Sequence, residues 1–186
     1  QNILENPAEV KVAATPQAAP KIDQQTKAIN GEEKNKTIVE EINAREGSIL
    51  IFARTQKRTD RLTYFLERFN IKASRIHGGR SQGQRNRALE EFRDGTVRVM
   101  VATDIAARGI DIDHVAHVIN YDLPQVPEDY VHRIGRTARA GREGKALSLI
   151  SHEERGLWRD IEKLLAGKGT SAQREAQFKV APAKSE

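Results

Sequence analysis

Short apolar runs alternate along the chain with segments whose apolar residues recur at helical spacing. Four runs have the length of a strand and are rich in Val, Ile and Leu, at residues 49–53, 97–102, 115–121 and 146–150. Near-continuous apolar runs are typical of strands that are covered on both faces. Weaker patterns predict two further strands, near residues 27–29 and 72–76.

The segments between these runs predict helices with one apolar stripe each. One helix opens with the capping-box spacing of Ser81 and Gln84 and ends near Gly95, and the last helix opens with Ser151 and Glu154. A weaker pattern predicts a helix around residues 38–42. The stripes are formed by Leu62, Phe65, Leu66 and Phe69, by Ala88, Leu89 and Phe92, and by Leu157, Trp158, Ile161, Leu164 and Leu165.

This alternation of strands and helices predicts an α/β fold, an open and mainly parallel sheet with helices on both faces. In such sheets, ligands bind at the carboxyl ends of the strands. The residues that follow positions 53, 76, 102 and 121 are therefore the first candidates for a functional site.

The two ends of the chain differ from its middle. Residues 1–21 hold three prolines and few large apolar residues, which is typical of a linker or a strand extension. Residues 22–166 carry the strand and helix patterns and form the predicted domain. Residues 167–186 are polar, basic and aperiodic, and we predict that they are disordered. Met100 is the only methionine, so we expect the chain to be processed or cut from a longer protein.

Composition narrows the classes of function. Lysine and arginine number 31 against 26 acidic residues in 186, a net charge of +5 that favours a polyanionic partner. The absence of cysteine excludes disulfides, thiolate zinc sites and cysteine nucleophiles. His114 and His117 have no clustered acid to complete a metal site, so no metal is predicted. Without a long apolar run or a leader pattern, we expect a cytoplasmic protein with no membrane contact.

The most specific stretch is rich in arginine. Arg133, Arg136 and Arg139 are three residues apart, and His132 precedes Arg136 by four. On a helix they would form a one-sided row of cations, with no acidic residue between positions 129 and 143 to neutralise it. Guanidinium groups match phosphate oxygens in bidentate geometry, so the row favours phosphate binding. The alternative is a solvated basic helix face.

A second stretch follows the strand predicted from the apolar run before it. Thr103 and Asp104 come at the carboxyl end of that strand, where a hydroxyl and backbone amides can hold a phosphate. Asp111 is an acceptor suited to sugar hydroxyls or to Arg108. The equally supported alternative is a helix capped by Thr103 or Asp104 and stopped at Gly109.

A third stretch combines His77-Gly78 with Gln82 and Arg85, on the helix that begins at Ser81. A helix N-terminus beside an arginine can bind an anion. By itself, however, the pattern is better explained by an ordinary capped surface helix. Thr55, after the first apolar run, has the same two interpretations.

Nucleotide-binding loops are absent from the sequence. No Walker A loop occurs, because Gly144-Lys145 and Gly167-Lys168 are not followed by Ser or Thr. There is also no Asp-Glu-Ala-Asp string to hold magnesium. This chain can contact a nucleotide, but it does not supply the loop that would bind the nucleotide's phosphates.

Taken together, these stretches resemble the C-terminal RecA-like domain of the DEAD-box ATP-dependent RNA helicases, and within them the bacterial RhlE-like branch. The resemblance covers about residues 49–150, with Ala138 and Gly79 as departures from the usual Gly and Asp. His132 matches the DEAD-box branch, whereas glutamine would suggest a DEAH helicase. The matching motifs are residues 49–55, His77-Gly78 with Gln82 and Arg85, residues 102–111, residues 121–124 and residues 132–139.

The resemblance implies an ATP site shared with a second domain. Arg136 and Arg139 would reach the ATP phosphates, with Arg139 as the arginine finger. The Gly109 backbone and Asp111 would meet the ribose. Mg²⁺ would be held by the N-terminal RecA-like domain, to which His132 and Arg108 would couple.

The resemblance also implies RNA binding with little sequence preference, because the contacts go to phosphate and 2′-hydroxyl groups. We therefore expect half of an RNA helicase that does not hydrolyse ATP alone. The alternative is a stand-alone, non-catalytic module that binds RNA or phosphate. The residues expected to hold RNA are Thr55, Gly78, Gln82, Arg85 and Thr103.

Overall fold

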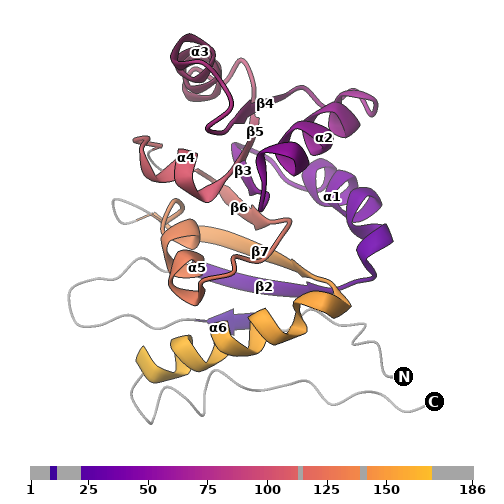
Figure 1. The fold of residues 1–186 in the computed structure, drawn as a ribbon, viewed down its shortest axis with the longest axis vertical. Helices are drawn as coiled ribbons and strands as arrows, with labels where there is room; N and C mark the ends of the chain where they lie inside the picture. The colour runs from indigo at the N-terminus through magenta and orange to yellow at the C-terminus, as the bar shows by residue number, and fades with distance from the viewer. Residues whose placement is uncertain (1–8, 12–21, 113–114, 139–141, 169–186) are drawn as a thin grey trace.

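Seven strands form one sheet in the computed structural model, which describes residues 9–11, 22–112, 115–138 and 142–168. The strand order is β1-β2-β7-β6-β3-β5-β4, and every pair is parallel except β1 with β2 (Figure 1). The strands are β1 (Glu9–Lys11), β2 (Ile22–Ala28), β3 (Ile49–Phe52), β4 (Ala73–Ile76), β5 (Val99–Ala102), β6 (His117–Asn120) and β7 (Gly144–Ile150).

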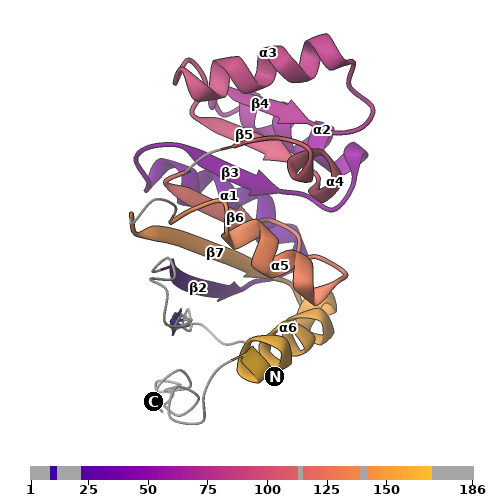
Figure 2. The same cartoon turned by 90° about the vertical axis from the view of Figure 1, so that its left-hand side faces the viewer.

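Helices cover both faces of the sheet. Helices α1 and α2 lie on one face, and α3, α4, α5 and α6 lie on the other (Figures 1 and 2). The helices are α1 (Lys34–Asn43), α2 (Gln56–Glu67), α3 (Gln82–Arg93), α4 (Asp104–Arg108), α5 (Pro127–Ile134) and α6 (Arg155–Lys168), with 3-10 turns η1 (Gly31–Glu33) and η2 (His152–Glu154). The predicted open, mainly parallel α/β sheet is confirmed.

The apolar runs are continuous because both faces are buried. In β3, Ile49 and Ile51 pack in the cluster under α1 and α2, whereas Leu50 and Phe52 pack in the cluster under the other helices. Successive side chains of a strand point to opposite faces, so a strand with two covered faces has no solvent-facing position and can be apolar throughout.

The chain leaves β3 across one face of the sheet and leaves β5 and β6 across the other. After β3 it crosses to β4 and returns through β5, and it then passes to the other side of β3 to form β6 and β7. Phe52 is opposite both Ala102 of β5 and Asn120 of β6, so the three strands end at one edge. This edge is the topological switch point at which α/β sheets bind ligands.

Several boundaries differ from the sequence prediction. Strand β2 begins at Ile22, five residues before the expected run, and β5 begins at Val99 rather than at residue 97. Phe69 was placed on the buried stripe of α2, which is wrong. The helix ends at Glu67, and Phe69 is half exposed next to Asn70, which has a positive φ of 58°.

The ends of the domain also show unexpected structure. Residues 9–11 form a strand that pairs with β2, within the segment expected to be a linker or a strand extension. Helix α6 continues through Gly167 and ends at Lys168, two residues beyond the expected boundary at 166. Residues 169–186 of the predicted tail lie outside the described residues.

Candidate nucleotide and RNA site

The loops that carry the predicted site residues meet at the carboxyl edge of the sheet. Backbone hydrogen bonds join them: Thr103 N donates to Ile76 O at 3.3 Å, and Tyr121 N and Asp122 N donate to Phe52 O at 3.1 and 3.2 Å. Backbone contacts alone therefore hold these segments side by side, although they are widely separated in sequence.

Arg133 is the most deeply buried charged residue of the site. It lies on the last turn of α5, is 1% exposed, and donates to both carboxylate oxygens of Asp104 at 2.6 and 2.7 Å. Its third nitrogen donates to Asn120 Oδ1 at 3.1 Å and to Asp122 O at 2.5 Å. The guanidinium carbon lies 4.9 Å from the centre of the Phe52 ring, a cation–π distance.

The predicted one-sided row of cations on a helix is therefore wrong. Helix α5 ends at Ile134, so Arg136 lies on the following turn and not on the same helix face as Arg133. Arg133 is neutralised by Asp104, a carboxylate that lies 29 residues away in sequence and next to it in space. Arg139 lies outside the described residues.

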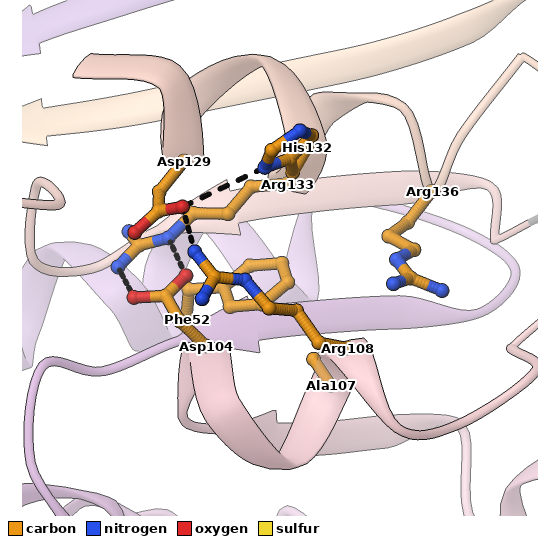
Figure 3. A pocket seen from close by; sticks show the side chains of 8 residues that line it. All are labelled: Phe52, Asp104, Ala107, Arg108, Asp129, His132, Arg133 and Arg136. Atoms are coloured by element: carbon orange, nitrogen blue, oxygen red, sulfur yellow. Dashed lines mark hydrogen bonds and ion pairs between the residues drawn. The ribbon is translucent and has the colours of Figure 1, made fainter. Parts of the chain in front are cut away.

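His132 and Arg108 stay at the surface, with their side chains 64% and 53% exposed. Arg108 forms an ion pair with Asp129, and His132 Nδ1 lies 3.6 Å from the same carboxylate oxygen (Figure 3). The predicted alternative of an Arg108–Asp111 contact is wrong, because α4 directs Arg108 toward α5. Asp129 instead joins the two residues that were expected to act together.

Arg136 links the stretch of residues 132–139 to the stretch of residues 102–111. Its Nη1 donates to the carbonyl of Ile110 at 3.0 Å, and Figure 3 shows its side chain standing apart from Asp104 and Asp129. An open hollow of about 340 Å³ lies in front of it. The hollow is lined by Arg108, Val131, His132, Gly135 and Arg136, and its basic side chains suit the phosphates of a nucleotide.

Gly109 and Asp111 follow α4 at the same edge. Gly109 is the C-cap of that helix, as its stop interpretation predicts. The Asp111 side chain is exposed, and its backbone carbonyl accepts a hydrogen bond from Arg93 of α3. Both residues are exposed to solvent, so a ligand can reach them.

Three of the residues expected to hold RNA occupy capping positions or have partners of their own. Thr55 is the N-cap of α2, where its hydroxyl accepts from Arg58 N at 3.2 Å, and the residue remains exposed. Gln82 donates to Asn86 at 2.8 Å on the exposed side of α3. Thr103 occupies the N-cap position of α4 without a side-chain cap bond.

The turn after β4 is arranged around His77. Its Nε2 lies 3.1 Å from Asp60 Oδ1, and its Nδ1 accepts from Gly79 N at 3.2 Å. Since Nδ1 accepts, Nε2 is assigned as the protonated nitrogen. A Cβ at Gly79 would lie 2.7 Å from Gln56 Oε1, the end of a flexible side chain, and 3.2 Å from the His77 ring, so a larger residue would require both side chains to shift slightly.

The sequence analysis missed an ion cluster at the same edge. Lys34 Nζ lies 2.5 Å from Glu154 Oε2 and 3.6 Å from Asp122 Oδ1, and it donates to Tyr121 O at 2.7 Å. Glu154 was predicted only as a capping residue, which it also is. No sequence signal marks the pair, because its two members lie 120 residues apart.

Asp122 is the second buried carboxylate of this cluster. It accepts from Arg58 Nε and Nη2, both at 2.7 Å, and from Arg54 N at 3.0 Å. Burial alone would raise the pKa of Asp122, but these bonds and the charge of Lys34 outweigh it, so the pKa lies below its usual value. Burial likewise raises the pKa of the neighbouring Tyr121 to about 12.

In the part of the chain that the structure describes, no group of three or more His, Asp or Glu residues is placed to hold a metal ion. His117 instead hydrogen-bonds the carbonyl of Glu46, and His114 lies outside that part. Among the described residues, no helix is long and apolar enough to cross a membrane.

Comparison with known proteins agrees with this geometry. Residues 33–141, more than half of the chain, match the family described as the helicase conserved C-terminal domain. The DEAD-box ATP-dependent RNA helicase CshA of Bacillus licheniformis is 40% identical over 164 residues, which cover 88% of this chain and 34% of that protein. The chain thus spans about a third of this curated relative.

Solved structures show the same fold. The E. coli DEAD-box protein SrmB, bound to regulator of ribonuclease activity A, is 33% identical with a TM-score of 0.73, over 91% of this chain and 100% of that chain. S. cerevisiae Dbp5 L327V, bound to RNA and ADP BeF3, is 30% identical with a TM-score of 0.72, over 87% of this chain and 44% of that chain. The chain therefore belongs to the helicase conserved C-terminal domain family and, within it, to the DEAD-box RNA helicases.

Proposed function

We propose that this domain is the second half of an ATP-dependent RNA helicase, which completes an ATP site and carries part of an RNA-binding surface. The observation that supports this most directly is the basic hollow beside the carboxyl edge, with Arg136 and His132 among its lining residues. An N-terminal RecA-like domain would bring the Walker A loop, the Mg²⁺ ligands and the catalytic acid.

The ATP-facing residues would be those that line or follow this hollow. Arg136 is held by the Ile110 carbonyl and Arg139 follows it by three residues, so both would contact the phosphates, with Arg139 as the arginine finger. Gly109 and Asp111 would contact the ribose. Developing negative charge on the phosphates is stabilised by cations that are already in place.

Interdomain coupling would use the exposed pair beside the hollow. His132 and Arg108 share Asp129 and are more than half exposed, so a neighbouring domain can reach both. Closure of the two domains on the nucleotide would bend one RNA strand and separate a short duplex.

The RNA-binding surface would follow the ends of β3, β4 and β5. It would include Thr55, Gly78, Gln82, Arg85 and Thr103. Arg85 is half-buried on α3, and a guanidinium group at this position is suited to pair with a phosphate oxygen. The related Dbp5 structure is bound to RNA, which supports an RNA-binding role for this chain. Contacts to the RNA backbone would give little sequence preference. A cytoplasmic location and an RhlE-like branch remain predictions.

The test is the RNA-stimulated ATPase activity of the full natural protein, with Arg139→Ala against wild type. We expect turnover to fall by about 10³-fold or more while ATP binding is largely retained, because an arginine finger acts at the transition state. Arg142→Ala, a nearby exposed arginine, is the matched control and should keep its activity. Unchanged turnover in Arg139→Ala, or no activity in any of these proteins with RNA present, would favour a non-catalytic RNA- or phosphate-binding module.

A further inference from the structure

Lys34 and Glu154 form a buried ion pair outside the motif-bearing stretch of residues 49–150. Lys34 begins α1 and Glu154 ends η2, and their side chains are 4% and 6% exposed. Removing two charges from water is costly, and apolar residues of similar size often stabilise a fold as well or better. Stability alone therefore does not explain why charges occupy these two positions.

The contacts of the pair show what it holds. Glu154 Oε1 accepts from Leu123 N at 2.9 Å and from Arg54 Nη2 at 3.0 Å, and Lys34 Nζ donates to Tyr121 O at 2.7 Å. The pair thus joins the ends of four strands: β2 through Lys34, β3 through Arg54, β6 through Tyr121 and Leu123, and β7 through Glu154.

Arg54 is hydrogen-bonded through both its backbone and its side chain. Its backbone N–H donates to Asp122 at 3.0 Å, and its guanidinium donates to Glu154 and, at 3.3 Å, to the carbonyl of Leu123. The next residue is Thr55, the exposed N-cap of α2. A shift in the Arg54 side chain would therefore be passed directly to the turn that presents Thr55.

We propose that Lys34 and Glu154 are positioning residues, which hold the Arg54–Thr55 turn in place for contact with an RNA phosphate. The proposal rests on the RNA binding proposed above. Lys34 lies against both Glu154 and Asp122, the two carboxylates that accept hydrogen bonds from Arg54. Through this ion pair, the start of the domain at β2 and α1 is connected to the turn that carries Thr55.

The test uses the 186-residue chain with Glu154→Gln, and Glu153→Gln as the matched control. Glu153 is the exposed neighbour, so its variant has the same change in net charge without touching the pair. Binding of a fluorescein-labelled ten-nucleotide oligouridylate is measured by anisotropy. We expect the dissociation constant to rise about fivefold to tenfold in Glu154→Gln and to stay within twofold in the control.

A second measurement does not depend on RNA. Amide hydrogen exchange of peptides covering residues 53–58 and 121–124 should accelerate at least tenfold in Glu154→Gln, whereas peptides from α3 should not change. The double variant Lys34→Met with Glu154→Gln removes both charges, which avoids an unpaired buried lysine. It should unfold near the wild-type temperature and still show both effects.

The outcomes separate the two proposals. If the wild-type chain does not bind the oligouridylate, the proposed RNA surface fails, and hydrogen exchange alone decides whether the pair holds the turn. Exchange at residues 53–58 that matches the control would overturn the positioning role. So would faster exchange there with an unchanged dissociation constant in a chain that binds RNA.

Discussion

Two groups of basic side chains lie at the same edge of this sheet and have different surroundings. Arg133 and Lys34 are almost fully buried, and each forms an ion pair with a carboxylate. Arg108 and His132 are more than half exposed, and with Arg136 they line an open hollow. Buried charges must be matched inside the protein, whereas exposed charges can be matched by a partner.

The difference separates two roles that look alike in sequence. Arg133 and Arg136 belong to one stretch of arginines, yet the first organises the domain and the second faces the hollow. The buried group fixes where the loops lie, and the exposed group then meets the ligand from those fixed loops. Variants of the buried residues should therefore lose stability, whereas variants of the exposed residues should lose ligand binding.

The largest effect is expected at the buried arginine. Arg133→Met would leave Asp104 without its bidentate partner and Asn120 without a donor, and it should lower the free energy of unfolding by about 3–5 kcal/mol. Urea unfolding followed by the fluorescence of Trp158, the single tryptophan, measures this.

Arg136→Met is the control for that prediction and should cost about 1 kcal/mol, the size of one hydrogen bond to a carbonyl. Equal losses in the two variants would break the division between a buried and an exposed group. Adding Asp104→Asn to Arg133→Met should recover part of the lost stability, because the unpaired charge is then removed.

An intermediate effect is expected from the titration of Asp122. Its pKa is lowered in the folded state, so its contribution to stability is complete above the unfolded value near 3.8 and is lost as the pH falls through the lower folded value. Wild type should therefore exceed Asp122→Asn by about 1–3 kcal/mol at pH 7. The difference should shrink below about pH 4.

Urea unfolding of both proteins between pH 7 and pH 3 measures this difference. Glu40→Gln, at an exposed position of α1 that contacts Lys36 at 3.9 Å, is the control and should give a nearly constant offset. A gap between wild type and Asp122→Asn that does not change with pH would show that the carboxylate is not stabilised by its buried partners.

The smallest effect is expected on the exposed side, in RNA binding. Arg85→Ala should weaken oligouridylate binding about threefold to tenfold and reduce the slope of log affinity against log salt by about 0.7, since one phosphate contact is lost. The fold should be unaffected. Anisotropy titrations between 50 and 200 mM salt measure both quantities, at roughly the salt range over which such contacts weaken.

Arg87 provides the matched control on the same helix, because it is exposed and pairs with Glu91 at 3.0 Å. Arg87→Ala should leave both the affinity and the salt slope close to wild type. The same loss in both variants would mean that α3 contributes only general positive charge and no particular contact at Arg85.

Much of the fold could be predicted because its signals are local. Continuous apolar runs mark strands with two covered faces, and Ser81 with Gln84 marks the start of α3. The end of α2 was less predictable: Phe69 continues the apolar spacing, but the chain turns at Asn70 and leaves the ring half exposed. Spacing reports which residues would share a helix face, but it does not show where the helix stops.

The class of fold and the order of the motifs could be predicted from the sequence, because both depend on periodicity or on residues close together in the chain. Which basic residues are buried depends instead on tertiary contacts. Asp104 neutralises Arg133, and Glu154 neutralises Lys34 across 120 residues. The desolvation cost of a buried charge is offset by opposite charges and hydrogen bonds close to it in space. The crossovers of a parallel sheet bring these groups together from distant parts of the chain.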